Sequence, residues 1–277
     1  MKSYQFEIPY NFDPMLIELL AMFDPMGTMY NCIYVCPYPQ DYAATPRNDM
    51  FVNNIDKMSR IEYVQQMEMI NQRFPGKLQL LLQNPNKLMD EKYLNFYHKI
   101  GFNKFCVNSF EQASLIKSLF PTAEVIGSIT LHADKAMLDA HPEFKKVFSG
   151  FVLDFRFCRE LETIKQLPKD YRYVLLTNAY CNCNCDGTHH WFKEPGKENY
   201  CPGLMWDTGW DKSTRIRPMD LHIFEPYISV FKLQDRGWPT QDIIRDVILY
   251  TTDFSLYPGI EYDEKIYNTR GHQDAEK

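Results

Sequence analysis

The chain has 277 residues, of which 30 are Lys or Arg and 36 are Asp or Glu, and apolar residues make up 45%. An aromatic content of 15% excludes an intrinsically disordered chain, and 12 Gly with 17 Pro but no short repeat exclude a fibrous protein. The formal charge of −6 gives no overall positive field, which disfavours a protein that only binds nucleic acid.

The longest apolar stretch near the start, residues 15–23, contains Glu18 and is too short to span a bilayer. It also lacks the basic flank of a signal peptide, so we expect a cytoplasmic protein without a membrane span. In that reducing compartment the eight Cys residues are expected to be thiols or metal ligands rather than disulfides.

Short runs of β-branched or aromatic residues alternate along the chain with segments of helical periodicity. Strands are expected at 4–9, 31–36, 78–83, 104–108, 124–131, 150–155, 172–178 and 229–233. Helices are expected at 14–23, 60–74, 90–100, 110–119, 135–147 and 160–166. Strands that alternate with helices in this way pair in parallel.

Eight such units predict an α/β protein with the fold of a (β/α)8 TIM-like barrel, and an open doubly wound sheet is the alternative. Residues 1–261 are expected to form a single domain, followed by a polar tail at 262–277. Two connections are long, 37–60 after the second strand and 179–227 after the seventh. In a barrel both leave the carboxyl ends of strands, where active sites are built.

A Cys-rich loop follows the seventh expected strand. Within 21 residues it contains Cys181, Cys183, Cys185, His189, His190 and Cys201. Thiolates at this density indicate a metal, and four Cys with two His could form a tetrahedral zinc site. The C-x-C-x-C spacing differs from the C-x2-C pairs of typical zinc sites, and a distant further ligand suits an iron–sulfur cluster in a loop. Both metals therefore remain open on the spacing, with a slight preference for iron–sulfur.

Charged side chains near the ends of the sixth and eighth strands are candidates for substrate contact. Asp154 and Arg156 alternate at the end of the sixth strand, and Lys232 and Arg236 follow the eighth. Two cations at a barrel mouth can bind a carboxylate or a phosphate, and Arg can do so with two parallel hydrogen bonds. The alternative is a ring of salt bridges with Asp154 and Asp235 as the anions.

Four segments carry a family resemblance, in chain order: YQFEIPYN, NCIYVCPYP, FRFCRELETIKQL with its Arg-Glu-Leu at 159–161, and RPMDLHIFEPYISVFKLQDRGWPTQDIIRDVILY. The last is the most specific, through Pro218, Asp220, Leu221, Lys232, Arg236 and Tyr250. Together they resemble the collagenase-like U32 peptidase family, in its iron–sulfur branch of oxygen-independent hydroxylases.

The resemblance implies a TIM-like barrel with a 4Fe-4S cluster bound by four Cys. It also implies oxygen-independent hydroxylation of RNA bases or quinone precursors, in some members by paired paralogues. The interval from Cys185 to Cys201 is similar to that between the family's second and third cluster Cys, and His222 stands where members carry the fourth. The expected metal ligands are Cys181, Cys185, Cys201 and His222, with Cys36 and Cys183 as alternates.

The leading hypothesis is therefore a 4Fe-4S barrel enzyme that hydroxylates or otherwise modifies an RNA base, a peptide or a small aromatic substrate by redox chemistry. One alternative is a zinc-dependent hydrolase or peptidase-like enzyme, in which metal-bound water is the nucleophile. Another is a non-catalytic, cluster-bearing partner subunit of a paralogous enzyme, and a homodimer is also open. The sequence contains no HExxH or GxSxG motif, which disfavours the common protease mechanisms.

Overall fold

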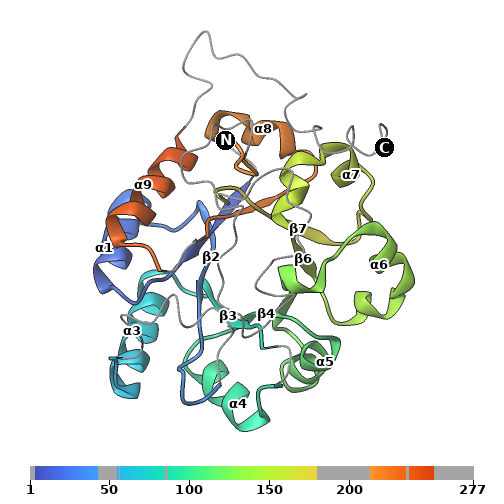
Figure 1. Ribbon diagram of the computed structural model, residues 1–277. Helices are drawn as coiled ribbons and strands as arrows, with labels where there is room; N and C mark the ends of the chain where they lie inside the picture. The colour runs from blue at the N-terminus through green and yellow to red at the C-terminus, as the bar shows by residue number, and fades with distance from the viewer. Residues whose placement is uncertain are drawn as a thin grey trace.

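The computed structural model describes residues 4–42, 55, 57–84, 87–179, 213–234 and 237–252. Among these residues eight parallel strands form a closed barrel in the order β1 to β8, ringed by helices (Figure 1). The strands are β1 Gln5–Pro9, β2 Tyr30–Val35, β3 Leu78–Leu82, β4 Lys104–Val107, β5 Glu124–Gly127, β6 Gly150–Leu153, β7 Arg172–Leu176 and β8 Val230–Lys232. The predicted TIM-like barrel is confirmed, and the open sheet is excluded because β8 pairs with β1.

The helices lie outside the barrel and connect successive strands (Figure 1). The α-helices are α1 Pro14–Phe23, α3 Arg60–Arg73, α4 Glu91–Lys99, α5 Phe110–Leu119, α6 Lys135–Ala140, α7 Leu161–Lys165, α8 Leu221–Phe224 and α9 Thr240–Thr251. Short 3-10 helices are η2 Ile129–Leu131, η3 Pro142–Lys146, η4 Phe155–Arg159 and η5 Pro218–Asp220. No helix within these described ranges is long and apolar enough to cross a membrane.

Side-chain caps fix where several helices begin. At α1 the Asp13 carboxylate accepts a hydrogen bond from the Met15 N–H, and Pro14 occupies the first helical position. At α3, Ser59 and Glu62 form a reciprocal capping box, which satisfies two backbone N–H groups at once. Both starts agree with the helices that the sequence predicts.

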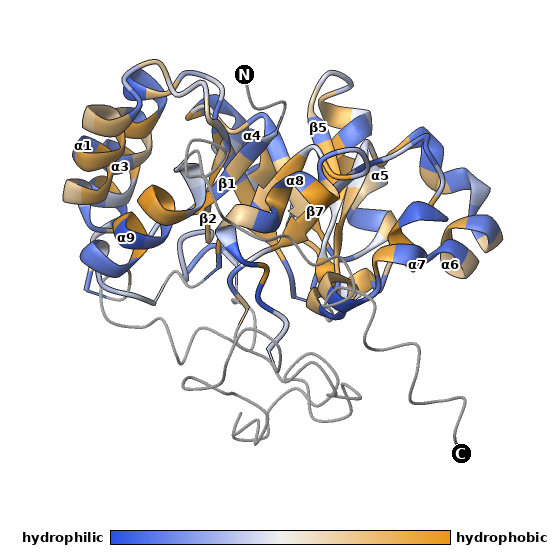
Figure 2. Cartoon of the chain, turned by 90° about the horizontal axis from the view of Figure 1, so that it is seen from above, coloured by the Kyte–Doolittle hydropathy of each residue, from blue (hydrophilic) through white to orange (hydrophobic). Residues whose placement is uncertain are grey.

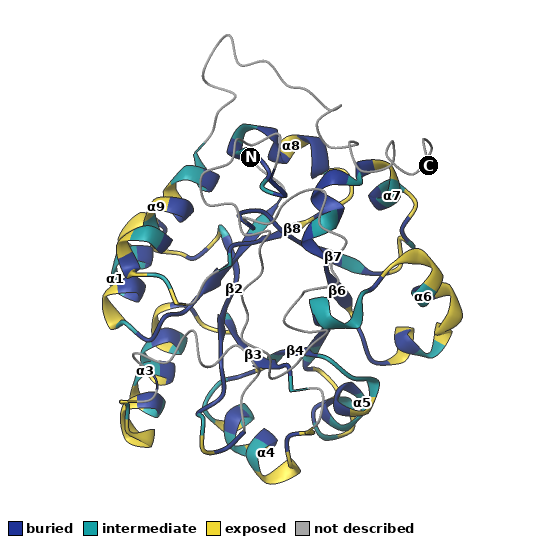
Figure 3. Ribbon diagram, in the orientation of Figure 1, coloured by how far each residue is buried: buried dark blue, intermediate teal, exposed yellow. Residues whose placement is uncertain are grey.

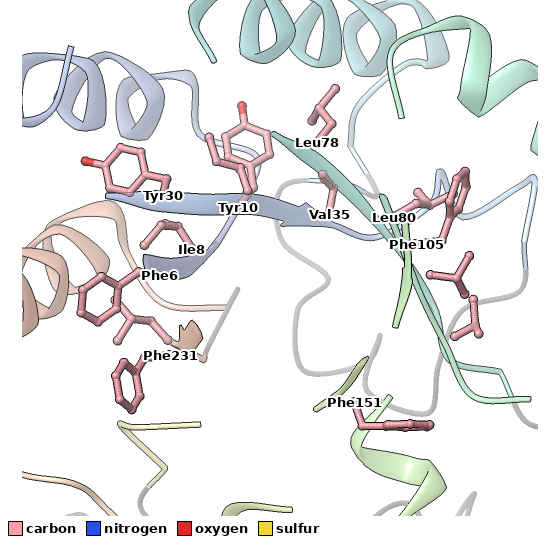
Figure 4. Packing of buried hydrophobic residues seen from close by; sticks show 14 of the residues in the cluster. Phe6, Ile8, Tyr10, Tyr30, Val35, Leu78, Leu80, Phe105, Phe151 and Phe231 are labelled. Carbon is pink, nitrogen blue, oxygen red and sulfur yellow. The ribbon is translucent and has the colours of Figure 1, made fainter. Parts of the chain in front are cut away.

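Alternation along the strands builds two apolar layers. One set of residues faces the helices, including Ile8, Leu80, Phe105, Phe151 and Phe231, which project from the strands toward the surrounding helices (Figure 4). The alternate residues form a second, smaller cluster in the barrel interior. Figure 3 shows the strands largely buried, while the helices have one buried and one exposed face. Their hydropathy follows the same division (Figure 2).

Several predicted elements differ in extent from the structure, among them the following three. The strand expected at 124–131 ends at Gly127, because the Ser128 hydroxyl caps η2 instead of continuing the ladder. The helix expected at 135–147 is divided at Pro142, which begins η3. The strand expected at 150–155 ends at Leu153, so Arg156 lies in η4 rather than on the strand. The expected tail at 262–277 lies outside the described residues.

Candidate functional site

The carboxyl ends of the strands share one mouth of the barrel, because all eight strands are parallel. Polar side chains collect just beyond several of these ends. Gln83 follows β3 and Ser128 follows β5, and the Gln83 amide donates to the Ser128 hydroxyl at 3.0 Å. Asp154 follows β6 and Asn178 follows β7 by two residues, and all four residues are buried. The mouth therefore carries a group of buried polar side chains.

Below the mouth, Lys232 and Glu7 form an ion pair inside the barrel. The two residues are register partners on β8 and β1, and the Lys232 Nζ lies 2.5 Å from the Glu7 Oε2. The ammonium also lies 3.5 Å from the centre of the Tyr34 ring. The sequence singled out Lys232 as an anion-binding cation but missed Glu7, which compensates its charge. The only sequence signal was an acidic residue at the centre of a strand.

The other oxygen of Glu7 faces two amides. Its Oε1 accepts hydrogen bonds from the Asn31 Nδ2 and the Gln79 Nε2, each at 3.4 Å. The Gln79 Oε1 is buried and has no hydrogen-bond partner among the described residues. The Glu7 carboxylate is thus the centre of a small polar cluster that crosses the barrel interior.

Asp154 and Arg156 form a second ion pair, at the mouth itself. Three hydrogen bonds hold it: the Arg156 backbone N–H to Oδ1 at 2.9 Å, Nε to Oδ1 at 2.8 Å, and Nη2 to Oδ2 at 2.7 Å. Burial of the Asp154 carboxyl raises its pKa, but its interactions with His132 and Arg156 outweigh burial, so the pKa lies well below the usual range. Asp154 is therefore an anion at any physiological pH.

His132 completes this cluster from the neighbouring strand. It ends η2, just beyond β5, and its Nδ1 lies 3.6 Å from the Asp154 Oδ2. The sequence reading did not select His132, since nothing in the local pattern marks it. Its backbone adopts the left-handed conformation, with φ of 49°.

Three described cysteines are buried thiols, Cys32 and Cys106 in the barrel interior and Cys158 among the side chains that face the helices. Burial raises the pKa of Cys106 to about 12 and that of Cys32 well above its ordinary value. Cys158 is also buried, and its thiol donates to the Leu176 carbonyl. All three thiols lie among buried apolar side chains, which is the environment of packing residues.

A set of buried contacts joins the chain on either side of residues 180–212, and we call it the rim clasp, formed by Arg159, residues 177–179 and residues 213–216. The fully buried Arg159 guanidinium donates to the Ser213 carbonyl at 2.8 Å and 2.5 Å and to the Arg215 carbonyl at 3.1 Å. The Thr214 hydroxyl donates to the Ala179 carbonyl at 2.9 Å. The two ends of the segment therefore meet at the carboxyl end of β7.

Helix α9 secures the rim clasp from outside. The Tyr250 hydroxyl contacts the Thr177 carbonyl at 3.1 Å and the Ile216 carbonyl at 2.9 Å, and the Asn178 amide donates to Asp246 at 2.9 Å. Both Arg159 and Tyr250 were noted in the sequence only as part of a family resemblance. The structure gives each a physical role in holding the chain at the barrel rim.

The predicted site residues are only partly covered by the described ranges. His222 is exposed on α8, and its Nδ1 lies 2.9 Å from the Met219 carbonyl, to which it donates. Cys36 is buried in the layer between strands and helices. His222 and Cys36 are the two candidates for the fourth metal ligand. His222 precedes β8 and Cys36 follows β2, so that β8 and β1 lie between them in the barrel wall.

Other predicted residues lie outside the described residues: Cys181, Cys183, Cys185, Cys201 and Arg236. Among the residues that the structure does describe, no three His, Cys, Asp or Glu side chains are grouped as a metal site would require.

Comparisons with known proteins bear on the fold. No protein-family model and no curated protein matches the chain. The U32 peptidase Mk0906 is similar in structure, with a TM-score of 0.52 and 11% identity over 85% of this chain and 94% of that one. The tryptophan synthase A-subunit from Pyrococcus furiosus gives a TM-score of 0.50 and 9% identity over 90% of this chain and 98% of that one. The chain thus shares a TIM-like barrel fold with both proteins, and a fold shared by such different enzymes does not choose a reaction.

Proposed function

We propose that this protein is an iron–sulfur enzyme in which Cys181, Cys185 and Cys201 bind a 4Fe-4S cluster at the carboxyl mouth of the barrel. The observation that carries the proposal is the rim clasp. It fastens both ends of the Cys-rich segment 180–212 to the mouth, where barrel enzymes assemble their active sites.

Chain length supports this position. Cys181 follows Ala179 by two residues, and two residues span at most about 7 Å of extended chain. A metal bound to Cys181 would therefore lie close to the end of β7 whatever path the chain takes. Asp154, at the end of the adjacent β6, belongs to the same part of the mouth.

The donor chemistry also fits. Thiolates are the usual ligands of iron–sulfur clusters, and the Cys-rich segment contains four Cys within 21 residues. When bound, such a cluster would supply one-electron redox chemistry. The barrel's own residues would then bind and orient the substrate and exclude water from it.

For the fourth ligand we propose His222, with Cys36 as the rival. The His222 Nδ1 donates to the Met219 carbonyl, so Nε2 is the nitrogen that would bind iron. Cys36 lies among apolar side chains of the outer layer, and reaching the mouth would require it to leave that packing. The exposed position of His222, compared with the packed position of Cys36, favours His222 as the fourth ligand.

The proposed reaction is oxygen-independent hydroxylation, or a related redox modification, of an RNA base, a peptide or a small aromatic compound. Asp154 with Arg156, and Lys232 with Arg236, remain the proposed substrate contacts. Two ion pairs in the described part of the chain narrow the choice of substrate, because the charge of Glu7 already compensates that of Lys232, and the charge of Asp154 that of Arg156. A neutral polar substrate group is therefore favoured over a free anion at these positions.

Single substitutions test the ligand set. After anaerobic purification, Cys181→Ser, Cys185→Ser and Cys201→Ser should each lose iron, while Cys183→Ser should retain it. Cys106→Ser is the matched control, since it removes a buried thiol of the barrel interior that is not a proposed ligand. His222→Ala should make the cluster labile. Iron loss in Cys36→Ser with full retention in His222→Ala would refute the fourth ligand.

Metal analysis of the same preparations decides between the proposal and its alternatives. One zinc per chain without iron would indicate a zinc-dependent hydrolase. Full iron with activity only in the presence of a paralogous chain would indicate a cluster-bearing partner subunit.

A further inference from the structure

Helix α1 carries apolar side chains on its outward face as well as on the face that packs against the barrel. Leu16, Ile17 and Leu20 are buried, whereas Met15 and Met22 lie on the opposite side of the helix and are 57% and 79% exposed. Figure 2 colours α1 as hydrophobic along most of its length. The outward face of a surface helix is normally charged or polar, so the apolar outward face of α1 indicates a contact with another molecule.

The exposed apolar side chains of the described residues are concentrated at this helix. Eight large apolar side chains are exposed in the described part of the chain, and four of them lie between residues 15 and 26: Met15, Met22, Phe23 and Met26. Single exposed apolar residues are ordinary, whereas a contiguous group of them marks an interaction surface. We call these four residues, together with Glu18, the α1 face.

The order of residues along the α1 face is nearly symmetric. Glu18 is the one charged residue of α1; Met15 precedes it by three positions and Met22 follows it by four, so all three lie on the same side of the helix. The sequence apolar, charged, apolar is therefore similar in both directions. A two-fold contact between antiparallel α1 helices would place Met15 against the partner's Met22, and Met22 against the partner's Met15.

The charges of this surface are also complementary to a copy of it. In a two-fold contact the two Glu18 carboxylates would lie near the axis, where like charges repel. Arg73, the last residue of α3, compensates each of them, since its Nη2 lies 2.9 Å from the Glu18 Oε2. The Arg73 and Glu18 side chains are 53% and 46% exposed, so both signs of charge are presented to a second copy. An anionic lipid surface would instead be repelled by Glu18.

We propose that the α1 face forms a weak two-fold contact between two copies of this chain. Specific interfaces bury about 800 Å² per partner, whereas α1, with ten residues that each rise about 1.5 Å, is only about 15 Å long. The contact therefore extends to the helices on either side of α1 in the ring, where Ile61 on α3 and Ile248 on α9 are exposed (Figure 1). This surface lies on the outside of the barrel and is independent of the proposed function at its mouth.

Sedimentation velocity at several protein concentrations tests the contact. A small interface gives weak association, so the wild type should be a monomer at about 1 μM and approach twice that mass at about 100 μM. Met22→Lys should remain a monomer at both concentrations, because it places a charge in the centre of the contact. Leu88→Lys is the matched control, since Leu88 is an exposed apolar residue that precedes α4, outside the α1 face, and this variant should associate like the wild type. A wild type that is monomeric at about 100 μM, or a Met22→Lys variant that still dimerises, overturns the proposal.

Oxidation of methionine shows which surface is covered. Hydrogen peroxide converts accessible Met side chains to sulfoxides, which mass spectrometry counts. Met15 and Met22 should oxidise several-fold more slowly at about 100 μM than at about 1 μM protein, while Met137 on α6, across the ring from α1 (Figure 1), should oxidise equally at both. Equal rates for Met15 and Met22 in a protein that dimerises would show that another surface is used and would overturn the proposal. Iron content is measured on untreated samples, so absence of the cluster would refute the proposed function without affecting this result.

Discussion

Replacing Arg159 by Met should destabilise the protein strongly, because it removes the central donor of the rim clasp. The guanidinium is fully buried, and its described hydrogen bonds satisfy the carbonyls of Ser213 and Arg215. Each buried carbonyl left without a partner costs about 1–3 kcal/mol. The Ser213 carbonyl is buried, whereas the Arg215 carbonyl is part-buried and can be reached by water, so we expect a loss of about 1–3 kcal/mol in the free energy of unfolding, mainly from Ser213. Arg159→Lys, which keeps one donor group, should lose less.

Urea unfolding followed by circular dichroism measures this loss. Arg73→Met is the matched control, because Arg73 is 53% exposed and its ion-pair partner Glu18 is 46% exposed, far from the rim clasp on the surface of α3 and α1. That variant should stay within about 0.5 kcal/mol of the wild type. If Arg159→Met were as stable as the control, the clasp would not hold this part of the barrel together, and the structural support for the proposed site would be lost.

Three further predictions concern other parts of the fold. The folded protein lowers the pKa of Asp154, so the stabilisation from this carboxylate is complete above its unfolded pKa of about 3.9 and is lost as the pH falls below that value. In thermal melts at decreasing pH, Asp154→Asn should therefore lose less stability than the wild type. Equal losses would contradict the lowered pKa. Glu7→Gln and Lys232→Met should each lower the free energy of unfolding by about 3–5 kcal/mol in denaturant, because each leaves one buried charge without its partner. The double variant should lose less than the sum of the two single losses. Additive losses would mean that the two side chains are not coupled. Gly150→Ala should unfold at a much lower temperature than Gly76→Ala, because its Cβ would clash with the backbone carbonyl oxygen of Arg172 on β7. The Cβ at position 76 meets nothing within 4 Å, and only the positive φ there is costly. Similar melting temperatures of the two variants would contradict this packing.

The barrel could be predicted because its strands carry a strong local signal. The β-branched and aromatic runs place all eight strands, and Pro14 with its Asp13 cap marks where α1 begins. The boundaries that differ do so where side chains compete with the ladder, as at Ser128. Helix α9 was foreseen only through the family resemblance, although its apolar spacing is regular.

The interior chemistry could not be predicted in the same way, because it depends on which residues the barrel closure brings together. Glu7 and Lys232 are separated by almost the whole chain and become register partners only when β1 pairs with β8. His132 and Asp154 come together because they follow the paired strands β5 and β6. A sequence marks the residue types, whereas the pairings come from the closed topology.

The most direct test of the central claim is the iron and sulfide content of the wild-type protein after anaerobic purification. We predict about four iron and four sulfide per chain, the composition of one 4Fe-4S cluster, with a thiolate-to-iron absorption band in the visible range. A colourless protein that contains one zinc and no iron would contradict the proposal that the segment held by the rim clasp binds a cluster.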